Sequence, residues 1–123
     1  MAVFEPIGER EMLQIAEKMI KRIKLVCPRF SVPADEDDHA ELIKVWAGAL
    51  RGQMEYPRSV YWKALEIYAS TATRDDNPPM PGDILRFCRL AVERMESDPV
   101  TREKLSQWRE ARRLERDRRM GPI

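Results

Sequence analysis

The sequence predicts an all-α protein, with a compact four-helix domain over residues 1–98 and a fifth, charged C-terminal helix or tail over residues 99–123. Apolar residues recur at spacings of three and four in four successive segments, which is typical of amphipathic helices. Proline-containing stretches separate these segments, and no segment alternates apolar and polar residues as a half-buried strand would. A chain of 123 residues has room for one domain and a tail.

The first helix is predicted over residues 9–26. Charged residues stand between its apolar ones, as expected for a helix that lies on a core. Its predicted buried face consists of Met12, Ile15, Ala16, Met19, Ile20, Ile23 and Val26.

The segment "CPRFSVPADEDD" ends this helix, because its two prolines forbid continuation. Phe30 and Val32 are apolar residues within this loop, so we expect them to pack against the core. The acidic run from Asp35 to Asp38 caps the second helix and places negative charge at its positive end. The predicted buried face of this helix consists of His39, Leu42, Ile43, Trp46, Ala49 and Leu50.

The third helix is predicted to start at Pro57 and the fourth at Pro81, since proline suits the first helical position. The stretch "NPPMPGD" before the fourth helix is a stiff corner, and Asp83 adds about 0.3–1 kcal/mol by facing the positive end of that helix. The fourth helix should end near Ser97. The predicted buried faces consist of Val60, Tyr61, Ala64, Leu65, Ile67 and Tyr68 in the third helix, and of Ile84, Leu85, Cys88, Ala91, Val92 and Met95 in the fourth.

Residues suited to catalysis or metal binding are few. Cys27 and Cys88 have no CxxC spacing, and we interpret them as buried, reduced thiols, with a disulfide or a zinc site as the alternatives. His39 follows the acidic run, but this run lacks the turn glycine and the oxygen-ligand spacing of a calcium loop, which favours helix capping. Neither a P-loop nor GxGxxG occurs. We therefore expect no enzymatic activity, no cofactor and no metal.

Signals for export or membrane insertion are not evident in the sequence. The first residues, "MAVFEPIGEREM", have no basic start followed by an apolar stretch, as a signal peptide would. No run of about 18 apolar residues is present to form a membrane span. We therefore expect a cytoplasmic protein without membrane partners.

The C-terminal segment differs from the rest in charge and in apolar content. The whole chain carries a formal charge of +1, yet residues 101–123 hold eight basic residues against four acidic ones. Leu105, Trp108, Ala111 and Leu114 recur every three residues, so their stripe drifts around a helix of 3.6 residues per turn. We expect this segment to be helix-prone but short of core, with Trp108 exposed and the segment frayed or disordered until a partner covers Trp108. The alternative is that Trp108 folds back onto the first or the fourth helix.

A partner-binding segment is the function that this C-terminal composition favours, because tryptophan and arginine are enriched among interface hot spots. Direct DNA binding is an alternative, since six arginines between residues 109 and 119 could contact phosphates, although four acidic neighbours weaken their field. A further alternative is a charged tail that is only solvated and has no binding role. Trp62 could lie at the rim of the core, or it could be a second residue that anchors a partner. The predicted partner-binding residues are Leu105, Trp108, Arg109, Arg112, Arg113, Leu114 and Arg116.

Four stretches carry a resemblance to a known family: "CPRFSV", "LIKVWAGAL", "YPRSVYWKALEIYASTAT" and "PPMPGDI". Together they resemble the N-terminal helical domain of phage replicative-helicase loaders and inhibitors, over roughly residues 10 to 95. The chain departs from that pattern in its acidic "ADEDDHAEL" stretch and its arginine-rich tail. None of the matching positions is catalytic.

The resemblance implies a phage- or prophage-encoded protein of DNA replication, acting in a bacterial host. It implies a folded helical module that binds replication proteins, followed by a flexible C-terminal segment that engages the hexameric helicase. A segment that orders on binding loses conformational entropy at that moment, which favours reversible contact. The alternative function is that of a small helical DNA-binding regulator of transcription.

Overall fold

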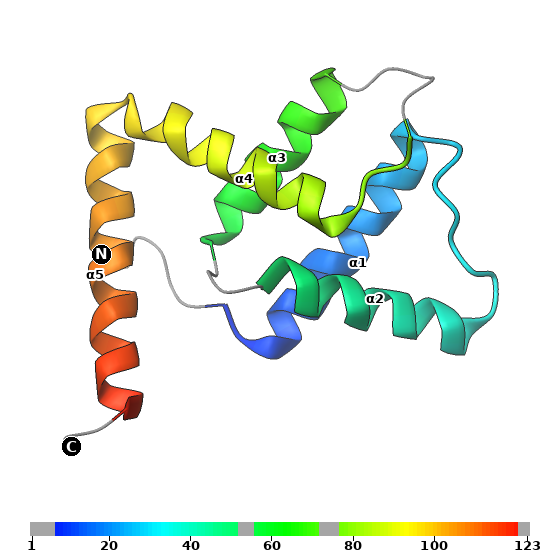
Figure 1. Ribbon diagram of the computed structural model, residues 1–123, viewed down its shortest axis with the longest axis horizontal. Coiled ribbons are helices and arrows are strands. Elements are labelled where there is room, and N and C mark those ends of the chain that lie inside the picture. Colours follow the sequence, from blue (N-terminus) through cyan, green and yellow to red (C-terminus); the bar gives the residue numbers. More distant parts are fainter. Residues whose placement is uncertain (1–6, 52–55, 72–76, 121–123) are drawn as a thin grey trace.

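The protein is all-α, as predicted. The structure, a computed structural model, describes residues 7–51, 56–71 and 77–120, without the side chains of residues 119 and 120. Figure 1 shows the arrangement of the helices in these ranges. They are α1 (Glu9–Val26), α2 (Glu36–Arg51), α3 (Arg58–Thr71), α4 (Pro81–Glu96) and α5 (Pro99–Met120).

Helices α1 to α4 surround one hydrophobic core. Helix α3 packs mainly on α4 and also on α1, while α2 packs on α1 and on α4. Helix α5 turns away at the end of α4 and stands at the edge of the four-helix body, as Figure 1 shows. Among the helices, α5 packs on α4. The proline positions therefore separate the elements as the sequence predicts.

The predicted buried face of α1 is confirmed except at its last residue. Val26 is 48% exposed, because the chain leaves the helix there and the next residue, Cys27, turns inward instead. The Lys24 ammonium donates hydrogen bonds to the carbonyls of Pro28 and Phe30, at 3.1 and 2.8 Å. These bonds fix the loop against the end of α1.

The loop after α1 contributes to the core, as expected. The ring of Phe30 is buried and meets Trp46 edge to face, with centroids 5.7 Å apart. Val32 is partly buried against the same cluster. Helix α2 then starts where predicted, since the Asp35 carboxylate accepts the N–H of Asp38 at 3.0 Å.

The buried face of α2 is shifted from the predicted one. Trp46 and Leu50 are buried, but Ala47 is buried where Ala49 was expected. The two positions lie about 200° apart around the helix, so only one of the two alanines can face the core. Three predicted residues in the first half of the helix are only partly buried: His39, Leu42 and Ile43.

The corner before α4 is held by its own hydrogen bonds. The Asp83 carboxylate accepts the backbone N–H of Met80 at 2.8 Å and pairs with Arg86. The Met80 hydrogen bond, and then the Arg86 contact, lower the pKa of Asp83 below its usual value. Pro79 is buried beneath this corner. The stiff corner and fixed helix start predicted from "NPPMPGD" are therefore present.

The faces of α3 and α4 agree closely with prediction. All six predicted residues of α3 are buried, and four of the six predicted residues of α4 are buried, with Leu85 and Met95 partly buried. Cys27 and Cys88 are free and buried, which confirms their interpretation as reduced thiols. Burial raises the pKa of Cys88 to about 12. Its thiol therefore behaves as a small apolar group.

Candidate functional site on helix α5

Helix α5 begins at Pro99, the predicted first residue of the C-terminal segment. The carboxylate of Asp98 caps it, accepting the N–H of Val100 at 3.3 Å and the hydroxyl of Thr101 at 2.9 Å. Proline cannot continue α4, since it has no N–H to donate to the preceding turn. The sequence "SDPV" therefore ends one helix and starts the next in a new direction.

The prediction that Trp108 is exposed is wrong. Leu105 is 0% and Trp108 3% exposed, and both belong to the core cluster that α1 to α4 build. Their spacing of three residues places them on one face of α5, and this face lies against the body. Trp108 folds back onto the domain, as in the alternative; α5 packs on α4, but the ring itself stacks on a residue of the connection before α3 and not on the first or the fourth helix. The predicted domain boundary at residue 98 therefore marks the start of a helix, but the hydrophobic core includes residues on both sides of it.

The neighbour that receives Trp108 is Tyr56, which the sequence reasoning missed in this role. Their rings are stacked, with centroids 6.3 Å apart and an interplanar angle of 16°. Tyr56 precedes Pro57 and lies outside the helices, so the helical periodicity carried no information about it. The available signal was a large aromatic residue in a short connection, which needs a core to join.

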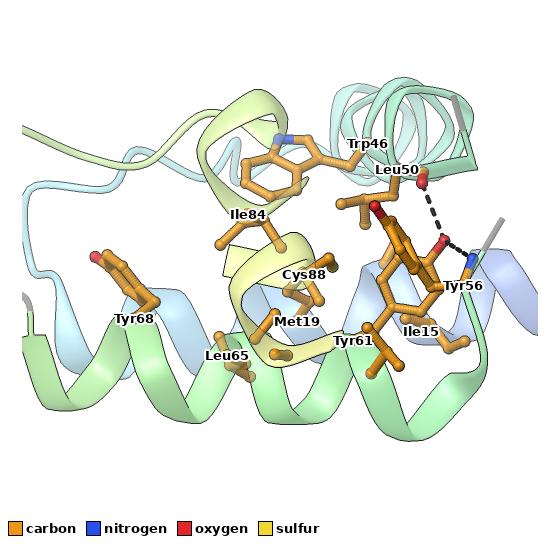
Figure 2. Packing of buried hydrophobic residues seen from close by; sticks show 14 of the residues in the cluster. Ile15, Met19, Trp46, Leu50, Tyr56, Tyr61, Leu65, Tyr68, Ile84 and Cys88 are labelled. Carbon is orange, nitrogen blue, oxygen red and sulfur yellow. Dashed lines mark hydrogen bonds between the residues drawn. The ribbon is translucent and has the colours of Figure 1, made fainter. Parts of the chain in front are cut away.

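Tyr56 is held in place by a buried hydrogen-bond chain, drawn in Figure 2. Its backbone N–H donates to the Tyr61 hydroxyl at 3.2 Å, and that hydroxyl donates to the Leu50 carbonyl at 3.0 Å. Burial, and then the neighbouring Cys88 thiol, raise the pKa of Tyr56 above its ordinary value. The stacking surface for Trp108 is therefore fixed by the ends of α2 and α3.

Three of the predicted partner-binding arginines make contacts within the chain. Arg109 reaches from α5 to α4 and pairs with Glu96 at 2.5 Å. The Arg112 guanidinium lies over the Trp108 ring, 5.6 Å from its centroid, a cation–π geometry. Arg113 pairs with Glu110 one turn earlier on α5. The positive field of α5 is therefore partly compensated by its own neighbours.

The remaining predicted residues face solvent. Leu114 is 52% exposed, and Arg116 is exposed as well. We call residues 109–118 the distal half of α5. They follow the anchoring residue Trp108, and none of them is buried. Partner binding by Arg109, Arg112, Arg113, Leu114 and Arg116 stays a prediction, whereas Leu105 and Trp108 are already covered by the protein itself.

The described residues contain neither a metal-binding cluster nor a helix suited to cross a membrane. Within ranges 7–51, 56–71 and 77–120, no three histidine, cysteine or acidic side chains converge as a metal site would require. No helix in those ranges combines the length and the apolar character needed to cross a bilayer.

Comparisons of the chain with models of protein families, with curated proteins and with solved structures gave no match.

Proposed function

We propose that this protein is a non-enzymatic accessory protein of DNA replication that binds a replicative helicase, as loader or inhibitor, through the distal half of α5. The observation that carries the proposal is the exposed apolar side chain of Leu114, which stands in the arginine-rich distal half of a helix whose base is packed in the core. Arginine is enriched at interfaces, and the exposed leucine supplies apolar area for a partner to cover. The choice of a helicase, and of a bacterial cytoplasm as the setting, comes from the resemblance in the first hundred residues.

The anchored base of α5 changes the expected binding mode. The resemblance implied a flexible segment that orders on binding, and this ordering would reduce affinity. With Leu105 and Trp108 packed in the core, the distal half already belongs to a formed helix. A partner then meets a preorganised surface and less conformational entropy is lost on association. In this proposal Leu105 and Trp108 position the contact helix, and they do not contact the partner.

The second candidate is a helical DNA-binding regulator, which the exposed arginines of the distal half favour. Against it stand the ion pairs of Arg109 with Glu96 and of Arg113 with Glu110, which reduce the charge available to phosphates. DNA binding through five or more phosphates should weaken by orders of magnitude between about 50 and 200 mM salt. Titration of duplex DNA at these two salt concentrations therefore separates the candidates.

The experiment for the leading proposal is capture of a purified bacterial hexameric replicative helicase by full-length protein. A truncation at Pro99 would remove Leu105 and Trp108 from the core, so a surface substitution is the cleaner variant. We expect Leu114→Asp to weaken capture at least tenfold, or about 1.4 kcal/mol. The matched control is Val100→Asp, which changes another exposed apolar residue of α5, at 64% exposure.

The control should bind like the unchanged protein, because Val100 lies at the opposite end of the helix. Equal capture by Leu114→Asp and the unchanged protein would remove the distal half of α5 from the mechanism. No capture by the unchanged protein would reject the helicase as partner.

A further inference from the structure

A hollow of about 190 Å³ lies between α1 and α3, two helices that do not pack on α5. It is lined on the α1 side by four residues spaced at three and four along one stripe, and on the α3 side by two residues. These residues are Glu11, Gln14, Ile15, Lys18, Arg58 and Trp62.

The apolar part of the hollow comes from Ile15 and Trp62. Ile15 is buried, so it closes the inner end, whereas Trp62 is only partly buried and presents ring surface to the hollow. The Arg22 guanidinium lies over the Trp62 ring, 4.9 Å from its centroid. A partly exposed indole that is held by a cation is a rigid apolar surface, the kind that is enriched at interface hot spots.

The charges around the hollow are predominantly positive. Arg58 of α3 pairs with Glu11 of α1 across the hollow, so the carboxylate that lines it is compensated. Lys18 also lines it, and Arg22 lies beside Trp62. Two cations and one acid thus line the hollow, and a third cation, Arg22, lies beside it. Such a surface complements a partner segment that carries carboxylates.

The size of the hollow decides what kind of ligand it fits. Pockets for small-molecule ligands and cofactors usually measure about 300–1,000 Å³, well above this volume. A hollow of about 190 Å³ has room for one large side chain. The volume therefore favours a side chain of a partner protein over a free cofactor.

We infer that the α1–α3 hollow is a second protein-binding site, which takes an aromatic or large aliphatic side chain from an acidic segment of a partner. The side chain packs on Trp62 and Ile15, and a flanking carboxylate of the segment meets Lys18. The hollow is formed by α1 and α3 and includes no residue of α5, so this inference does not depend on the proposed role of the distal half. With both surfaces, the protein could hold two partners at once.

The test is a titration of full-length protein with two amidated, N-acetylated peptides, followed by the indole N–H signals of its tryptophans in two-dimensional NMR. The acidic probe is Asp-Glu-Phe-Leu-Glu-Asp, and the control is Lys-Arg-Phe-Leu-Arg-Lys. Trp62→Phe assigns the Trp62 signal. We expect the acidic peptide alone to shift it saturably, with a Kd on the order of 1 mM, equivalent to about −4 kcal/mol.

Two substitutions at the rim sharpen the test. Lys18→Glu should weaken binding of the acidic peptide at least fivefold. Glu11→Gln should strengthen it by a similar factor, because Arg58 is then released from its carboxylate partner. A gain of affinity cannot result from a damaged fold. Absence of a saturable shift with the acidic peptide, equal shifts with both peptides, or an unchanged affinity in Glu11→Gln would overturn the inference.

Discussion

Trp108 of α5 stacks on Tyr56, which lies in the connection between α2 and α3, with the ring centroids 6.3 Å apart. This contact ties the last helix to a part of the chain more than 50 residues earlier. Because the Tyr56 N–H is bonded to the Tyr61 hydroxyl, and that hydroxyl to the Leu50 carbonyl, the stacking site is itself fixed by two helices. The direction of α5 therefore depends on the packing of the whole domain.

The first prediction concerns the anchoring of α5. Trp108→Ala should lower the free energy of unfolding by about 3–5 kcal/mol, since it removes a buried indole and leaves a cavity. Leu114→Ala on the same helix should change it by less than about 0.5 kcal/mol, because Leu114 is exposed. Equilibrium unfolding in urea measures both. Equal effects of the two substitutions would mean that α5 is not packed on the body.

The second prediction concerns the hydrogen-bond chain beneath Trp108. Tyr61→Phe removes a single hydroxyl but leaves the buried N–H of Tyr56 and the carbonyl of Leu50 without that partner. We expect a loss of about 1–3 kcal/mol in the free energy of unfolding, with an unchanged far-UV circular dichroism spectrum. A loss below that range would indicate that water replaces the hydroxyl.

The helices could be predicted from the sequence because their evidence is local. In α1, apolar residues at three and four residue spacings identify a buried face, and prolines mark where the chain must turn. The errors occur where the packing of neighbouring elements determines which residues are buried. Val26 belongs to the apolar stripe but lies beyond the reach of the core, and Ala47 is buried where Ala49 was expected, which depends on how α2 lies on its neighbours.

The candidate site was harder to predict, because it is made by contacts between distant residues. The pattern of Leu105 and Trp108 correctly indicates a helix, but whether a lone tryptophan finds a core depends on Tyr56, about 50 residues away. No local pattern connects these two residues. The same holds for Trp62, whose place beside α1 arises only when α1 and α3 pack together.

The third prediction concerns pH. The pKa of the Cys88 thiol is raised from 9.0 to about 12 by burial, so the folded protein holds a proton that the unfolded chain releases. The free energy of unfolding should therefore fall as pH rises, by about 1.4 kcal/mol between about pH 8 and pH 10 from this group. Urea unfolding at the two pH values measures the change. In Cys88→Ala this part of the pH dependence should vanish, and an identical slope in both proteins would contradict the assignment.

The fourth prediction separates the two halves of α5 by truncation. A chain that ends at Asp98 loses Leu105 and Trp108, whose separate removal costs about 2–5 and 3–5 kcal/mol in comparable cores. This loss approaches the whole stability of a typical domain, about 5–15 kcal/mol. We therefore expect the shortened chain to lose its near-UV circular dichroism signal and its cooperative thermal transition.

A chain that ends at Arg112 is the matched comparison, because it keeps both buried residues and the cation over the Trp108 ring. It should unfold cooperatively, with a free energy of unfolding within about 1 kcal/mol of the full chain, since the residues it lacks are exposed or only partly buried in the described part of the helix. If the chain ending at Asp98 were equally stable, residues 1–98 would form a self-sufficient core and the contact of Trp108 with Tyr56 would contribute little. If, of the two shortened chains, only the one ending at Arg112 unfolds cooperatively, then the residues that the fold requires end inside α5, after Trp108.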